Sequence, residues 1–167
     1  MNVLPLSTHF NAAVLTMASR VCPCGFDVLN DAPGSFDELQ DYYAKTGRLA
    51  VWSGASDATI FGNCEVNYAF RAWHDWTHLT YNLPFTLDGE RETARRQRED
   101  LRKVFGNGAV TEWFSALIEC EVTGQAEAFA KTGQFPADQV AFTLAWLWRR
   151  NLPASYSAAI ARSRVAA

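Results

Sequence analysis

The segment from His74 to His78 carries the strongest chemical signal in the sequence. The two histidines are four residues apart, so on a helix their side chains come from adjacent turns, about 5 to 6 Å apart at Cβ. A metal chelate on a helix requires this spacing. The sequence therefore predicts that His74 and His78 bind a metal ion. The alternative interpretation is a pair of buried histidines that are hydrogen-bonded to carboxylates.

A third ligand must come from another helix. A helix expected over residues 109–131 has an apolar face, and Glu121 lies near the centre of that face. A carboxylate there is costly to desolvate without a partner, so we expect it to meet an arginine, a histidine or a metal ion. Glu90, in the preceding helix, has the same chemistry and inward direction. We predict a metal site of His74, His78 and Glu121, with Glu90 as the alternate ligand.

Two imidazoles and one carboxylate leave coordination positions open for water or substrate, as in catalytic metal sites. Zn, Mn and Fe all suit such a divalent site. The ion would lower the pKa of a bound water, Asp75 or Glu90 would accept its proton, and Arg71 would stabilise negative charge. Plainer interpretations stay open: Arg71 pairs with Asp75 or Glu121, Asp75 orients a histidine, and Glu90 interacts only with the helix dipole.

Other polar residues share the inward faces of these helices. Their positions predict contacts with a substrate or, alternatively, a buried hydrogen-bond network. The candidate substrate-binding residues are Asn67, Tyr81, Gln97 and Gln125.

The elements that must position these residues indicate a mainly α protein of the α+β class, with a bundle-like helical core and a small N-terminal β element. Apolar residues at helical spacing and flanking glycines and prolines define the core helices. A capping box at Ser35–Glu38 starts an earlier helix. The expected helices cover residues 7–21, 35–45, 64–82, 90–105, 109–131 and 137–151, and the expected strands cover 26–29 and 48–53.

The chain of 167 residues fits a single domain. We expect mixed α and β structure to about residue 62, a helical core over about 63–152, and an alanine-rich tail over 153–167 that forms a short helix. The net charge of −3 lacks the basic excess typical of proteins that bind nucleic acid. No apolar run reaches the roughly 20 residues that span a membrane, so we expect a soluble, cytoplasmic protein. Its four cysteines are too few for a disulfide scaffold, and Cys22 and Cys24 form only a weak metal motif.

The string His74-Asp75-x-x-His78 resembles the His-Glu-x-x-His helix of zincin metalloproteases. The resemblance implies that the histidines bind zinc and that Asp75 activates water, although aspartate is shorter than glutamate and no third-ligand motif follows. The doublet His74-Asp75 also resembles that of HD-domain phosphohydrolases. That family's metal set would require His9 and a downstream aspartate, Asp100 or Asp138, at a spacing that departs from the family pattern.

A longer string, Asn67-Tyr-Ala-Phe-Arg71-Ala-Trp-His74-Asp75-Trp-Thr-His78, precedes Gly89-Glu90-Arg91 and Gln97. It is similar to a family of small proteins from tailed bacteriophages, over about residues 50–130. The resemblance implies the cytosol of an infected bacterium and supplies no activity.

These observations favour a metal-dependent hydrolase. Nucleotides or phosphoesters are the favoured substrates, because Arg71 and the arginine-rich helix near Glu90 suit anions. One alternative is a non-catalytic phage protein that binds or inhibits a host component. Another is a non-haem iron oxygenase, because two histidines and one carboxylate also bind Fe(II).

Overall fold

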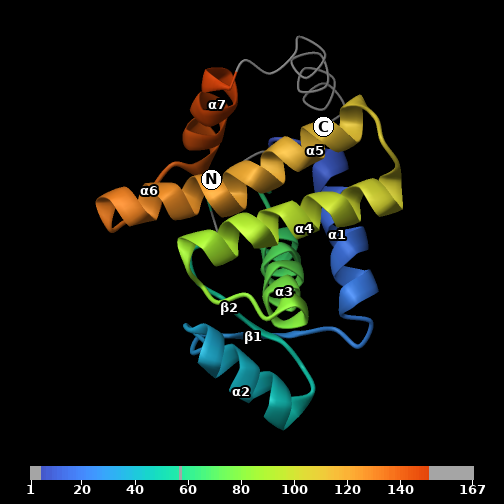
Figure 1. The fold of residues 1–167 in the computed structure, drawn as a ribbon, viewed down its shortest axis with the longest axis vertical. Coiled ribbons are helices and arrows are strands. Elements are labelled where there is room, and N and C mark those ends of the chain that lie inside the picture. Colours follow the sequence, from blue (N-terminus) through green and yellow to red (C-terminus); the bar gives the residue numbers. More distant parts are fainter. Residues whose placement is uncertain (1–4, 57, 151–167) are drawn as a thin grey trace.

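The protein is mainly helical, with one small parallel sheet (Figure 1). The computed structural model describes residues 5–56 and 58–150. The expected fold class is confirmed, and the expected helix in the tail lies outside the described residues. No helix in these two ranges is long and apolar enough to cross a membrane.

The N-terminal part forms a strand–helix–strand unit that follows the first helix, α1 (Thr8–Val21). Strands β1 (Asp27–Leu29) and β2 (Ala50–Trp52) are parallel, as expected of strands joined by a helical crossover. That crossover is α2 (Phe36–Thr46), which begins at the predicted capping box and ends at Gly47. Gly47 has φ 68°, a left-handed conformation that glycine adopts without strain.

The remaining chain is helical. The largest differences from the predictions are that α4 starts three residues earlier, that α7 is two residues shorter at each end, and that the long helix expected over 109–131 contains a π-helical turn, η1. A π turn adds one residue per turn, which a regular 3.6-residue pattern does not reveal. The elements are α3 (Cys64–Tyr81), α4 (Leu87–Phe105), α5 (Ala109–Glu119), η1 (Cys120–Gly124), α6 (Gln125–Thr132) and α7 (Gln139–Arg149).

Helix α3 lies between two hydrophobic clusters. The larger cluster joins it to α1, α4 and α5 and includes the fully buried rings of Trp73 and Trp113. The smaller cluster, which includes Leu39 and Val51, joins α3 to α2 and the sheet. Figure 1 shows α3 between the sheet and the helices that cross above it. Both clusters pack against α3, so this helix is held on two sides and supports the side chains of the site.

Candidate metal centre

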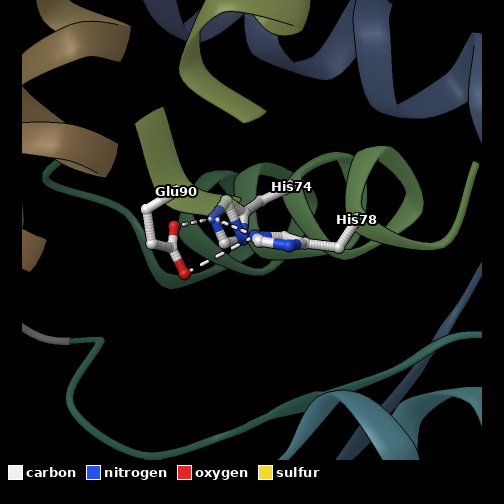
Figure 2. Close-up of side chains that lie close together, drawn as sticks. All are labelled: His74, His78 and Glu90. Carbon is white, nitrogen blue, oxygen red and sulfur yellow. Dashed lines mark hydrogen bonds and ion pairs between the residues drawn. The ribbon is translucent and has the colours of Figure 1, made fainter. Parts of the chain in front are cut away.

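His74 and His78 of α3 and Glu90 of α4 bring their polar atoms together (Figure 2). The Nε2 atom of His74 lies 3.2 Å from Nε2 of His78 and 2.9 Å from Oε2 of Glu90. The other carboxylate oxygen, Oε1, lies 3.5 Å from Nε2 of His78. In the described ranges, no other group of three His, Cys, Asp or Glu side chains comes this close. The predicted chelate pair is therefore joined by the alternate carboxylate.

These distances match the ligand spacing of a small divalent ion. Ligand atoms about 2.1 Å from zinc stand about 3.4 Å apart in a tetrahedral site and about 3.0 Å apart in an octahedral one. The 3.2 Å between the two nitrogens lies within this range, and the nitrogens of His74 and His78 lie 2.9 and 3.5 Å from different oxygens of the Glu90 carboxylate. An ordinary hydrogen bond between His74 and Glu90 would also be 2.9 Å long, so this distance fits both a metal site and a hydrogen bond. The partners of the Nδ1 atoms, on the outer side of the two rings, help to distinguish them.

The outer nitrogen of each imidazole faces an acceptor. Nδ1 of His78 donates to the carbonyl oxygen of Leu83 at 2.8 Å, with the hydroxyl of Thr93 at 3.4 Å. A carbonyl can only accept, so a neutral His78 has its lone pair on Nε2, toward Glu90. Nδ1 of His74 lies 3.4 Å from Oδ1 of Asp75. Metal-bound histidines characteristically donate their second N–H to a carbonyl or carboxylate, and both rings have such a neighbour.

The connection between α3 and α4 sets the position of Glu90. Asn82 ends α3 in a left-handed conformation, and the hydroxyl of Thr86 accepts a hydrogen bond from the Gly89 amide at the start of α4. A Cβ at Gly89 would lie 1.9 Å from the carbonyl oxygen of Pro84. Only glycine permits this approach, which brings the first turn of α4, and with it Glu90, against the end of α3.

Burial favours the neutral form of His74. Its side chain is 18% exposed, and desolvation, followed by the nearby His78, lowers its pKa to about 4. A metal ion would therefore not have to displace a proton from this ring near neutral pH. Desolvation also raises the pKa of Asp75, to about 7.

Asp75 lies behind His74, on the side of the ring away from the convergent Nε2 atoms. A base that takes a proton from a metal-bound water must reach that water, and the observed contact of Asp75 is with the outer Nδ1 atom instead. The structure therefore favours the interpretation in which Asp75 orients the histidine.

Glu121 is not part of the cluster, which corrects the predicted ligand set. Its Oε2 accepts a hydrogen bond from Gln125 Nε2 at 2.8 Å, and its Oε1 accepts one from the Thr143 hydroxyl at 3.3 Å. Thr143 belongs to α7, which packs against η1. Burial raises the pKa of Glu121 to about 7. The helical pattern correctly places this residue inside, but it cannot tell which neighbouring helix the side chain meets.

Arg71 binds main-chain oxygen atoms rather than a carboxylate. Its Nη1 donates to the carbonyls of Trp52 and Gly54, and its Nη2 donates to that of Ala55. The guanidinium also lies 5.6 Å from the centre of the Trp52 ring. Its expected ion pair with Glu121 does not form. Arg71 instead holds the loop that follows β2, a role that local helical spacing could not reveal.

The four candidate substrate contacts lie in three different surroundings. Asn67 donates to the hydroxyl of Ser56 at 2.9 Å and Gln125 bonds to Glu121, so both belong to buried networks. The Tyr81 ring is covered by the guanidinium of Arg96, 4.4 Å from its centre. Gln97 is fully buried, and its amide has no hydrogen-bond partner among the described residues.

Two contributors to the site were missed by sequence analysis, the Leu83 carbonyl and Thr93. Thr93 lies three residues after Glu90, on the same face of α4, so the wheel that selected Glu90 could have found it. The Leu83 carbonyl depends on the loop conformation, which has no comparable pattern.

The arginines of α4, which favoured an anionic substrate, are all engaged with carboxylates. Such pairs on an exposed helix surface lower the positive potential available to a ligand. The pairs are Arg91 with Asp88 and Glu127, Arg95 with Glu92 and Glu99, Arg96 with Glu92, Arg98 with Glu119, and Arg102 with Glu112.

Comparison with protein-family models, curated proteins and solved structures finds no match for this chain. The similarity to tailed-bacteriophage proteins thus stays a prediction from the sequence. The chemistry of the cluster has to be argued from its own geometry.

Proposed function

We propose that the protein is a metal-dependent hydrolase with one divalent ion held by His74, His78 and Glu90. The observation that carries this proposal is the convergence of two Nε2 atoms and one carboxylate, 2.9 to 3.5 Å apart. The hydrogen bond from His78 Nδ1 to the Leu83 carbonyl supports it, because this bond leaves the Nε2 lone pair for the ion. Three protein ligands leave at least one position for water.

The residues of the chain would divide the work of hydrolysis as follows. When bound, the ion would lower the pKa of a bound water to about 7 and so provide a nucleophile near neutral pH. Glu90 would hold the ion together with His74 and His78, and an oxygen of its carboxylate that is not bound to the ion could accept the proton of a bound water. Asp75 holds the His74 ring in place from behind.

Metal analysis of protein purified without an affinity tag tests the site. We expect about one equivalent of a divalent transition metal per chain, since the site offers one cluster of three ligands. His74→Ala and Glu90→Gln should both lose it. The matched control is His9→Ala, because His9 is exposed on α1 and lies outside the cluster. Less than about half an equivalent, unchanged by His74→Ala, would contradict the proposal and favour the non-catalytic binding protein.

The identity of the metal separates hydrolysis from oxidation. The same two histidines and one carboxylate form the ligand set of non-haem Fe(II) oxygenases. Zinc or manganese with oxygen-independent ester or amide cleavage would support the hydrolase. Iron with oxygen-dependent turnover would replace it with the oxygenase.

A further inference from the structure

In the part of the chain that the structure describes, the charges around the metal centre leave no unengaged arginine or lysine for an anionic substrate. Among the described residues, Arg71 is the one cationic side chain, apart from the histidines, whose charge acts on the pKa values of His74 and Asp75. Its guanidinium already donates to three main-chain carbonyls. Proteins usually bind phosphoryl groups with the free N–H groups of arginine or lysine. A phosphate bound by the same N–H groups would have to replace these hydrogen bonds.

Carboxyl groups rather than cations lie on the other sides of the centre. Glu90 lies within the ligand cluster, and the Asp75 carboxyl lies directly behind His74. The arginines of α4 are paired with the carboxylates described above, so they do not offset these two groups. A dianionic phosphoester would meet these carboxyl groups without an unpaired arginine of α4 to offset them.

An aromatic ring stands beside the metal ligands. The centre of the Phe85 ring lies 4.7 Å from that of His78, in an edge-on arrangement. Phe36 supports Phe85 from behind, at 6.0 Å between ring centres. Phe85 is half-buried, so part of its surface can contact another molecule. On the opposite ligand, Phe70 lies 6.1 Å from His74 and is almost fully buried.

We propose that the substrate is an uncharged ester or amide with an aromatic or branched apolar group. This inference rests on the proposed metal-dependent hydrolysis. The carbonyl oxygen binds the ion, and the apolar group packs against Phe85. The metal-bound water adds to the carbonyl carbon, the bond from that carbon to the leaving oxygen or nitrogen breaks, and the proton of the water passes through Glu90 to the leaving group.

Binding of three probes to the Co²⁺-loaded protein tests the inference near neutral pH. Benzohydroxamate and acetohydroxamate bind metals through the same carbonyl-containing group. Benzohydroxamate carries a phenyl ring where acetohydroxamate carries a methyl group. Visible absorption of the cobalt ion reports their binding. We expect benzohydroxamate to bind about tenfold more tightly, because its ring gains an apolar contact. Inorganic phosphate at the same concentration should leave the spectrum unchanged.

A variant tests whether Phe85 causes the preference for benzohydroxamate. Phe85→Leu should reduce the ratio between the two hydroxamate affinities, and Phe129→Leu should not. Phe129 is a suitable control because its ring stacks on Phe135 in a different part of the chain, on α6. Equal affinities in the unmodified protein, or a ratio unchanged by Phe85→Leu, would overturn the inference.

The two proposals fail in different ways. A protein that binds no Co²⁺ would overturn the metal centre and this inference with it. A protein that binds Co²⁺ through His74, and binds phosphate at least as tightly as benzohydroxamate, would overturn only the uncharged substrate.

Discussion

Glu121→Gln should stabilise the protein above neutral pH. The carboxyl is 8% exposed and its hydrogen-bond partners, Gln125 and Thr143, are both neutral. Burial raises its pKa from 4.5 to about 7 because the charged form loses its hydration. The folded state therefore holds a proton that the unfolded state releases between these two values. Glutamine keeps the size and polarity of the side chain and carries no charge at any pH.

The sign of the pH dependence follows from this difference. The contribution of protonated Glu121 to stability is fully present below about pH 4.5 and is lost as the pH rises through about 7. At about 1.4 kcal/mol per pH unit, the full loss is on the order of 3 kcal/mol. We expect Glu121→Gln to match the unmodified protein near pH 4.5 and to exceed it by up to that amount above pH 7.

Urea unfolding across this pH range measures the effect. Glu65→Gln is the matched control, because Glu65 is exposed at the start of α3 and should show no such gain. The metal content should stay at the level of the unmodified protein, since Glu121 lies outside the cluster. A stability difference that does not change with pH would refute the reasoning, as would a loss of stability above neutral pH. The latter result would mean that Glu121 is charged and paired.

Three further substitutions test how the site is held. Gly89→Ala should lose most of the bound metal although every ligand is intact, because the added Cβ would lie 1.9 Å from the Pro84 carbonyl oxygen. Circular dichroism checks that the variant is folded and metal analysis measures the loss. Retained metal would contradict this prediction. Asp75→Asn should weaken metal binding about tenfold through loss of its support of His74, as measured by competition with a chelator; an unchanged affinity would assign Asp75 no positioning role. Arg71→Met should lower the free energy of unfolding by about 1 kcal/mol, because the carbonyls of the loop after β2 lose their donor, and a loss of metal in the folded variant would show that Arg71 supports the site directly.

Local pattern was enough for the parts of the site that lie on one helix. Four-residue spacing predicts that His74 and His78 face the same way, and the wheel of the following helix predicts that Glu90 points inward. The capping box at Ser35–Glu38 likewise predicts the start of α2, which the structure confirms. In each case the relevant atoms are within about one turn of each other, so helical geometry alone determines their relation.

The sequence pattern could not predict which residues of different elements contact one another. Glu121 is inside, as predicted, but it meets Thr143 of α7, because tertiary packing decides which buried face touches which. Arg71 reaches carbonyls of the 52–55 loop, and no periodicity encodes a contact with the main chain of a loop. The π turn that carries Glu121 also escapes a helical wheel, since the wheel assumes one constant rotation per residue.

The hydrogen bond from His78 to Leu83 ties the ligand cluster to the short connection between α3 and α4. Glu90 lies in α4, just after the same connection. An ion held by all three ligands would therefore cross-link the two helices of the α3–α4 hairpin. Release of that ion would then require local opening of the hairpin. The rate of metal exchange would therefore report how often the α3–α4 hairpin opens. The ion would then dissociate slowly because the hairpin opens rarely, even if each bond between the ion and a ligand were weak.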